Sequence, residues 1–187
     1  MAVYQVKIPA FTFAGEGSIE KVKDIVEKEQ AKTALVFTDQ GIKNAGILTC
    51  LTEELDKLGI VYHVTDDLKA EPAYTDVEKT VEESSAFACD LIFAIGGGSV
   101  MDAAKLFSVL KGADYTLRDL LKDPSQARKR IKTVMIPTTC GTGAEATCNA
   151  IVAIPEEQSK KGIVNDSMIP DYVILDSQMI RKLPKSI

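Results

Sequence analysis

The stretch Leu91-Ile-Phe-Ala-Ile-Gly-Gly-Gly-Ser-Val-Met-Asp-Ala-Ala-Lys105 decides the fold of this chain. Its five apolar residues, 91–95, predict a buried strand, because the run is short and ends in glycines. The glycines 96–98 lack a Cβ, so the turn can take a positive φ and a ligand can approach the main chain. Ser99 is a favourable N-cap, and it predicts a helix over 99–110 whose first amides point at the turn. A phosphate group is the ligand expected there.

This glycine turn matches neither of the two common phosphate-binding motifs. No Lys-Ser or Lys-Thr pair follows the glycines, as a P-loop requires, and the third glycine of the dinucleotide fingerprint would fall at Met101. A tight strand-to-helix turn without a ligand is the alternative interpretation. The local sequence therefore leaves the ligand open.

Outward from this stretch, segments with strand and helix periodicity alternate along the chain. The alternation predicts an α/β fold, Rossmann-like, with a doubly wound and mostly parallel sheet and helices on both faces. Strands are expected at 3–8, 11–13, 34–37, 60–64, 133–136 and 172–175, and helices after Ser18, over 48–58 and over 74–87. The segments 151–154 and 163–164 flank a polar run and predict a short edge hairpin.

Composition limits the kinds of partner. At 187 residues the chain fits one domain with a substantial core, and a formal net charge of −5 argues against nucleic acid, which needs a basic face. No apolar run approaches the roughly 20 residues that cross a bilayer, and the first residues do not resemble a secretory leader. The four cysteines have no C-x-x-C spacing. We expect a cytoplasmic protein with reduced thiols, and neither a nucleic-acid nor a membrane partner.

Parallel sheets bind ligands outside the carboxyl ends of their strands, and Asp39 falls at such a place. It follows the strand at 34–37, where its carboxylate suits the two hydroxyls of an adenosine ribose and would repel a 2′-phosphate. A helix N-cap or a turn aspartate is the alternative role.

The loop 137–146, after the strand at 133–136, is the third candidate at this edge. It contains G-x-G-x-x-A at Gly141, Gly143 and Ala146, a weak dinucleotide signal that is equally typical of a structural turn. Three threonines add hydroxyls suited to a ribose or an amide: Thr138, Thr139 and Thr142. A helical turn is expected after this loop.

Together these residues resemble the iron-containing, or group III, alcohol dehydrogenases, a family related to glycerol dehydrogenase and more distantly to dehydroquinate synthase. The resemblance covers essentially all 187 residues in order and spacing. It is carried by Phe13-Ala-Gly15, Thr38-Asp39, Gly96-Gly-Gly-Ser99 with Asp102 and Lys105, Ile136-Pro-Thr-Thr139 with Gly141-Thr142 and Glu145, and Asp176 through Leu183-Pro184. Glycerol dehydrogenases usually continue the turn with Lys-Thr and dehydroquinate synthases with a Val-rich sequence, so the segment 99–102 favours the alcohol dehydrogenase branch.

The resemblance implies that 1–187 is a dinucleotide-binding domain for NAD. It implies that backbone amides around Gly96, Gly97, Gly98 and Ser99 hold the pyrophosphate, and that Asp39 selects NAD over NADP. Further contacts implied in the same way are Asp102 beside the phosphates, Thr138, Thr139 and Thr142 at the adenosine or nicotinamide end, and Lys160 or Lys161 near a ribose. For the two lysines, a solvated hairpin turn is the alternative.

The resemblance also implies a divalent metal, iron or zinc, held by one aspartate and three histidines of a helical second domain. Those ligands lie downstream of the position of Leu183-Pro184, and this chain has one histidine, His63, which we expect to be a packed or edge-strand residue. We therefore expect 1–187 to contain no catalytic residue and no metal ligand, and to be inactive alone. The intact enzyme is expected to interconvert a small alcohol and an aldehyde or ketone.

Other functions stay open at this stage. A truncated paralogue would keep the fold and act as a non-catalytic nucleotide-binding or interaction module, and a homo-oligomer is one candidate assembly. Cys140 as a nucleophile is disfavoured, because no acid–base histidine lies near it in sequence. Asp102 and Glu145 would serve as an acid–base pair only if the fold brought them together, which their spacing does not decide.

Overall fold

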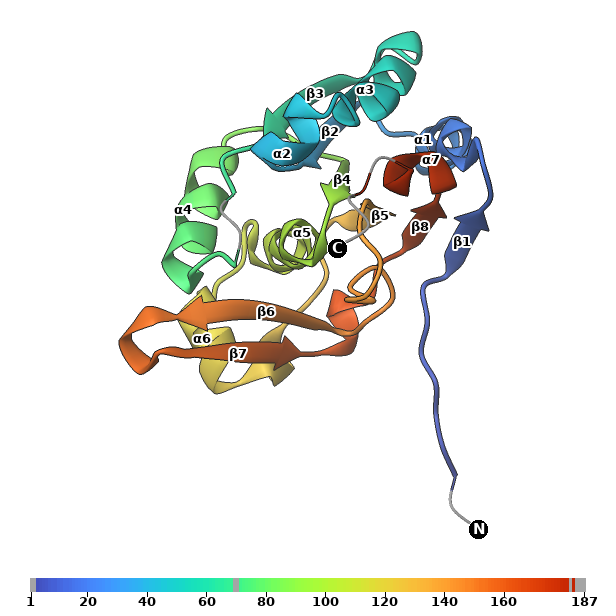
Figure 1. Cartoon of the computed structure of the whole chain (residues 1–187). Helices are drawn as coiled ribbons and strands as arrows, with labels where there is room; N and C mark the ends of the chain where they lie inside the picture. Colours follow the sequence, from blue (N-terminus) through green and yellow to red (C-terminus); the bar gives the residue numbers. More distant parts are fainter. Residues whose placement is uncertain (1–2, 69–70, 182, 184–187) are drawn as a thin grey trace.

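A six-stranded, all-parallel sheet forms the centre of the molecule in a computed structural model that describes residues 3–68, 71–181 and 183 (Figure 1). Its strand order is β1-β8-β5-β4-β2-β3. In that order the bounds are Phe11–Ala14, Tyr172–Leu175, Lys132–Pro137, Leu91–Gly96, Thr33–Phe37 and Val61–Thr65. The predicted α/β, Rossmann-like fold class is confirmed.

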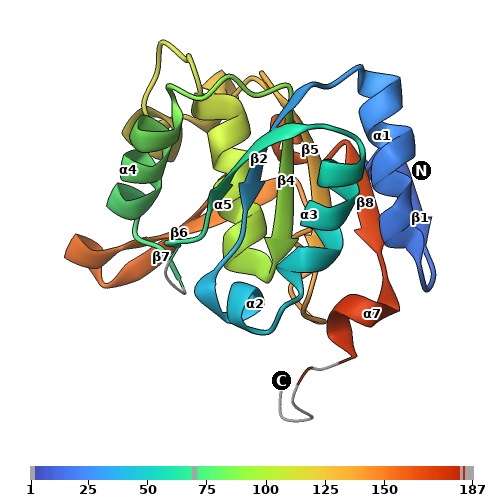
Figure 2. The same ribbon diagram turned by 90° about the horizontal axis from the view of Figure 1, so that it is seen from above.

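Helices cover both faces of this sheet (Figure 2). On one face, α1 (Val22–Glu29) and α3 (Leu48–Lys57) pack against a row of strand residues that includes Val36 and Phe93. On the other face, α5 (Gly98–Leu110) packs against the alternate residues, such as Leu35 and Ile92. Successive strand side chains point to opposite faces, so strands buried on both faces must be apolar throughout. The shorter helices are α2 (Gln40–Asn44), α4 (Tyr74–Ser84), α6 (Leu117–Lys122) and α7 (Ser177–Ile180).

The predicted hairpin is present, but it forms its own sheet instead of extending the edge of the large one. Its strands β6 (Asn149–Ile154) and β7 (Ser159–Val164) are antiparallel, and they lie across α5 from the six-stranded sheet (Figure 1). A second apolar cluster joins the hairpin to α4, α5 and α6. Helix α5 is therefore enclosed by two sheets, and every residue from Val100 to Leu110 is buried.

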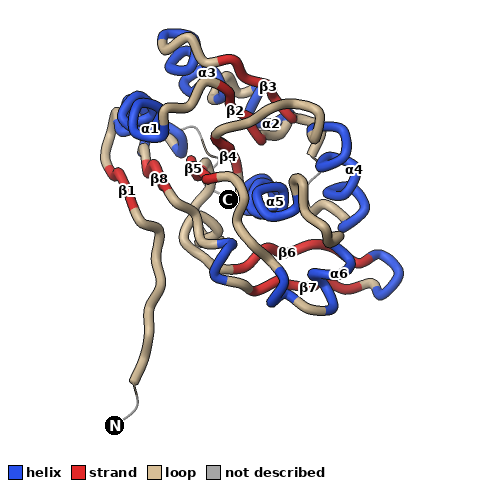
Figure 3. The backbone as a smooth tube through the Cα atoms, turned by 180° about the vertical axis from the view of Figure 1, so that it is seen from behind, coloured by secondary structure: helices blue, strands red, loops and turns tan. Residues whose placement is uncertain are grey.

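The first residues of the chain do not form the expected edge strand. Residues 3–8 are extended without strand pairing and run away from the body of the molecule (Figure 3), and the side chains of Val3, Tyr4 and Val6 are exposed. An apolar alternation becomes a strand only where a neighbouring strand can pair with it, and here the pairing with β8 begins at Phe11. Ser18 likewise begins a short 3-10 helix without capping it.

Among the described residues, no helix has the length and apolar character needed to cross a bilayer.

Candidate functional site

The turn between β4 and α5 places an open helix N-terminus at the carboxyl edge of the sheet. Gly97 is the N-cap residue in an extended conformation, and no side chain caps the helix. The amide of Met101 donates to the Gly97 carbonyl at 3.2 Å, so the amides of 98–100 precede the first hydrogen bond of this α5 ladder. The prediction that Ser99 caps the helix was wrong, because the N-cap is Gly97, two residues earlier, and Ser99 already lies inside α5. The helix N-terminus still has the free amides and the positive dipole end that suit an anion.

Close packing, and not backbone conformation, explains two of the three glycines of the turn. None of the three has a positive φ. A Cβ on Gly96 would lie 2.7 Å from Val100 Cγ2, and one on Gly98 would lie 2.9 Å from Thr142 Cγ2. A Cβ on Gly97 would meet Thr139 Oγ1 at 3.5 Å, an ordinary contact. Gly96 and Gly98 therefore allow the turn to pack against its surroundings.

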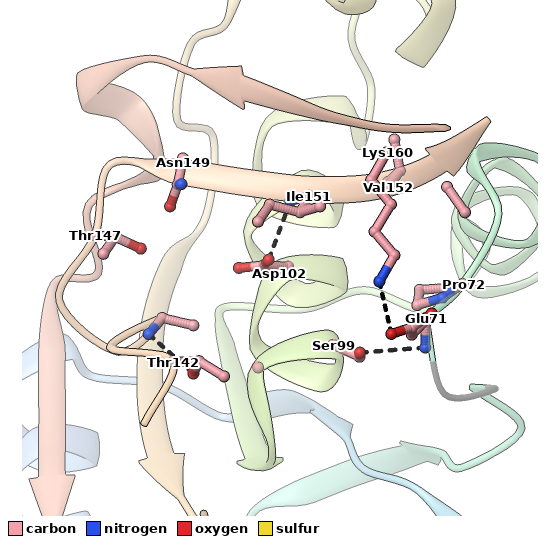
Figure 4. A pocket seen from close by; sticks show the side chains of 13 residues that line it. Glu71, Pro72, Ser99, Asp102, Thr142, Thr147, Asn149, Ile151, Val152 and Lys160 are labelled. Atoms are coloured by element: carbon pink, nitrogen blue, oxygen red, sulfur yellow. Dashed lines mark hydrogen bonds and ion pairs between the residues drawn. The ribbon is translucent and has the colours of Figure 1, made fainter. Parts of the chain in front are cut away.

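Two recesses flank this turn and share Gly98 and Ser99. The first, which we call the Asp39 recess, has a volume of about 430 Å³ and is also lined by residues that include Asp39, Gln40, Gly41, Gly97 and Thr139. The second, the hairpin recess (Figure 4), has a volume of about 260 Å³ and is lined by residues that include Glu71, Asp102, Thr142, Ile151 and Lys160. Eight of the ten residues predicted for cofactor binding line one recess or both.

The other two predicted residues, Gly96 and Thr138, are buried and line neither recess. Gly96 is buried at the end of β4, and Thr138 is fully buried with a hydroxyl that has no hydrogen-bond partner among the described residues. Thr138 donates its backbone amide to the Gly96 carbonyl at 3.0 Å, which links the two strand ends. The loop ends in a single hydrogen-bonded turn, in which the Ala146 amide donates to the Gly143 carbonyl at 2.9 Å, and the chain then enters β6 without forming a helix.

Asp39 has the capping role that the sequence left open, and its position is compatible with the other role, a contact with a ribose. It is the N-cap of α2, where its Oδ1 accepts a hydrogen bond from the Ile42 amide at 2.9 Å. The same half-buried residue lines the Asp39 recess. Because the cap hydrogen bond uses Oδ1, the capping role and a ribose contact through the other oxygen are compatible.

Asp102 and Lys105 form a buried ion pair one helical turn into α5. Asp102 Oδ2 accepts from the Ile151 amide at 3.0 Å (Figure 4), and Asp102 Oδ1 lies 3.3 Å from Lys105 Nζ. Lys105 Nζ also donates to Thr147 Oγ1 at 3.1 Å and to the Asn149 carbonyl at 2.9 Å. Burial raises the pKa of Asp102, although the positive charge of Lys105 acts in the opposite direction. Burial likewise lowers the pKa of Lys105, although the negative charge of Asp102 acts to raise it.

The contacts of Lys105 were not predicted from the sequence, where this residue is only part of a motif. Its side chain is 1% exposed, although lysine is almost never fully buried unless it is paired. An aspartate and a lysine at i and i+3 lie on one face of a helix. In a segment otherwise rich in apolar and small residues, that spacing was the available signal.

The hairpin separates the two lysines that the sequence could not tell apart. Lys160 lines the hairpin recess, with its Nζ 2.6 Å from Glu71 Oε1 (Figure 4), and the Glu71 amide donates to Ser99 Oγ at 3.3 Å. Lys161 pairs with Glu157 at 2.7 Å and lines a different hollow of the surface. Adjacent strand residues point to opposite faces, so only Lys160 is in the recess.

His63 lies on the edge strand β3, exposed, with its ring 5.7 Å from that of Phe87. The parts of the chain that the structure describes contain no group of three histidine, cysteine, aspartate or glutamate side chains placed to hold a metal.

Comparisons with known proteins agree on one family. The family model for iron-containing alcohol dehydrogenase matches residues 9–177. A sulfoacetaldehyde reductase of Bilophila wadsworthia is 32% identical over 175 residues, covering 91% of this chain and 44% of the relative. The NADH-dependent butanol dehydrogenase A of Clostridium acetobutylicum is 29% identical, over 100% of this chain and 48% of the relative. The chain thus spans about half the length of the curated relatives it matches.

Solved structures share the fold described above. An iron-containing alcohol dehydrogenase from Thermotoga maritima superposes with a TM-score of 0.88 at 32% identity, covering 98% of this chain and 50% of the other. A sulfoacetaldehyde reductase from Bifidobacterium kashiwanohense, solved in complex with NAD+, gives a TM-score of 0.89 at 26% identity, covering 98% and 49%. With the family model matched over most of its length, the chain belongs to the iron-containing alcohol dehydrogenase family.

Proposed function

We propose that residues 1–187 are the NAD-binding domain of a metal-dependent alcohol dehydrogenase that interconverts an alcohol and an aldehyde or ketone. The observation that carries the proposal is the uncapped N-terminus of α5, which opens on two recesses that share Gly98 and Ser99. A dinucleotide has two nucleoside halves joined at a pyrophosphate, and two recesses joined at a helix N-terminus match that plan. Two similar proteins support it: one is an NADH-dependent butanol dehydrogenase, and the other is a sulfoacetaldehyde reductase solved in complex with NAD+.

The residues present fit this cofactor. The N-terminus of α5 carries no side-chain cap, so its first amides are available to an anion. A side chain on Gly98 would clash with Thr142, since its Cβ would approach that side chain to 2.9–3.1 Å, so the glycine lets the loop 137–146 pack directly against the turn. In the proposal the amides of Gly97, Gly98 and Ser99 donate to the pyrophosphate, and Asp39 accepts from the adenosine ribose. Thr139 lines the adenosine side, while Thr142 and Lys160 line the other. Gly96 and Thr138 support the turn from behind, and NAD supplies the hydride carrier.

The rest of the catalytic apparatus is proposed to lie outside 1–187. A divalent metal, iron or zinc, would polarise the substrate oxygen as a Lewis acid, and the described residues hold no cluster for it. We also propose that this chain on its own binds cofactor but does not turn over alcohol. The four cysteines are free thiols, which fits a protein of the reducing cytoplasm.

Titration of the purified 187-residue chain with NADH, followed by cofactor fluorescence, tests the binding function. A saturable change is expected. No saturable response at millimolar NADH would overturn the proposal. Mixing the same chain with NAD, a primary alcohol and Fe²⁺ or Zn²⁺ tests the expected inactivity, and NADH formation above the rate without protein would contradict it.

Cofactor choice is tested by Asp39→Asn, which keeps a capping oxygen for the Ile42 amide but removes the negative charge. We expect the preference for NADH over NADPH to shrink, because the repulsion of the 2′-phosphate is lost. Asp123→Asn is the matched control, since Asp123 also caps a short helix but lies outside both recesses. An unchanged preference in Asp39→Asn would show that another residue makes the selection.

A further inference from the structure

The Asp102–Lys105 pair connects α5 to one continuous stretch, the start of β6 and the residues just before it. Asp102 binds the backbone of β6 at Ile151, and Lys105 binds the strand's first residue, Asn149, and the preceding Thr147. Both side chains come from α5, which also forms the other wall of the recess at Gly98 and Ser99. The first two turns of α5 therefore fix the position of the hairpin relative to the glycine turn.

Other contacts also hold the hairpin: the Ala153 amide donates to the Pro72 carbonyl at 3.0 Å, and the Asn165 amide donates to the Cys148 carbonyl at 2.9 Å. Its apolar contacts with α5 involve Leu106, Val109 and Leu110, which lie in the C-terminal half of the helix. A two-stranded sheet leaves the outward amides of each strand without strand partners, and Asp102 accepts from one of them, that of Ile151. The polar pair thus anchors the part of β6 that faces the helix N-terminus.

The carboxylate of Asp102 is already engaged on both oxygens, one by the Ile151 amide and the other by Lys105 Nζ. A carboxylate would also repel a phosphate group beside it. Both facts argue against a direct contact of Asp102 with the pyrophosphate.

We propose that Asp102 and Lys105 act as positioning residues: a clamp that sets the distance between the hairpin and the glycine turn. The clamp thereby sets the affinity of the site for the half of the dinucleotide that lies on the hairpin side. This inference rests on the proposed NAD-binding function. If Asp39 takes the adenosine ribose, the clamp affects the nicotinamide half and leaves the ADP half unaffected.

The test compares the affinities of the 187-residue chain for NADH, which would span both recesses, and for ADP, which would occupy only the Asp39 side. In Lys105→Met we expect NADH affinity to fall by about tenfold or more, as the loss of a charge-assisted hydrogen bond would give, while ADP affinity stays within about twofold. Hydrogen exchange at the Ile151 amide should become faster in the same variant. The control is Lys129→Met, which breaks the Lys129–Asp171 pair (2.9 Å) outside both recesses.

A second variant guards against misfolding. Asp102→Asn combined with Lys105→Met removes both charges, so no buried charge is left unpaired, and the same selective loss of NADH affinity is expected. Equal losses for NADH and ADP, or an unchanged NADH affinity, would overturn the clamp.

Failure of the proposed function gives a different result. The unaltered chain would then bind neither nucleotide. Hydrogen exchange at the Ile151 amide would in that case be the measurement that tests the clamp. Protection retained in both variants would overturn it, whereas faster exchange would support it as a hairpin anchor.

Discussion

The glycine turn and the β6–β7 hairpin are facing walls of one recess, yet the chain builds them in opposite ways. The turn is local: a strand ends at Gly96, a helix begins at Gly98, and the absence of Cβ atoms allows the close approach. The hairpin is held by partners far away in sequence, since Asp102 and Ile151 are 49 residues apart. The glycine turn should therefore be disturbed only by substitutions within it. The hairpin should also shift when a side chain far away in sequence is lost.

The largest expected effect on stability comes from removing an anchor of the hairpin. Lys105→Met should lower the free energy of unfolding by about 3–5 kcal/mol, because it leaves the Asp102 carboxylate buried without its countercharge. Urea unfolding followed by circular dichroism measures this change. Adding Asp102→Asn to the variant should recover much of the loss. A loss below about 1 kcal/mol in Lys105→Met would mean that water reaches the pair and screens it.

The local wall is tested by Gly96→Ala. Its new Cβ would meet the Val100 side chain at 2.7–3.0 Å, so we expect an overpacking penalty of about 1–3 kcal/mol in the free energy of unfolding. Gly162→Ala on β7 is the matched control, because nothing lies within 4 Å of the Cβ it would add. Equal unfolding midpoints for the two variants would show that the turn relaxes at no cost.

A smaller effect distinguishes the two faces of the hairpin. Lys160→Met should weaken NADH binding by about tenfold, equivalent to about 1.4 kcal/mol, whereas Lys161→Met should leave it unchanged. Fluorescence titration provides both values. The stability of either variant should hardly change, because the partners of both lysines are exposed carboxylates. The opposite ranking of the two lysines would contradict the register of β7 or the place of the cofactor.

The smallest effect concerns the start of β4, at the opposite end from the turn. Hydrogen bonds from the Lys32 amide and from Thr33 hold the pKa of Asp90 below its usual value of 3.8. A depressed folded-state pKa gives stability that is present above pH 3.8 and is lost as the pH falls through the folded-state pKa. Asp90→Asn should therefore cost less than about 1 kcal/mol at pH 7, since the group is exposed, and nothing in strong acid. A difference that persists at pH 2 would refute this account.

The same contrast explains how much the sequence predicted. The apolar runs of β2, β4 and β5 were sufficient to place the buried strands, because a strand enclosed on both faces must be apolar throughout. The alternation of residues 3–8 was misleading, since pattern alone does not supply a partner strand. The exact start of α5 was also missed, because a glycine N-cap leaves no polar side chain to recognise.

The site was predictable where it is local and only partly where it is not. Asp39 and the glycines 97–98 follow strands directly, so their position at the carboxyl edge could be inferred. The choice between Lys160 and Lys161 needed the register of β7, and the partners of Lys105 needed the path of the chain after Cys140. Spacing along the chain carries neither piece of information.

The hydrogen bond from the Ile42 amide to Asp39 has an evolutionary consequence. The residue that would decide which cofactor is admitted also holds the first turn of α2, so a single codon controls two traits. Mutations to alanine or valine would lose the cap together with the charge, while asparagine or serine would retain a capping oxygen. A change of cofactor preference in this lineage would therefore pass most readily through small polar residues at position 39.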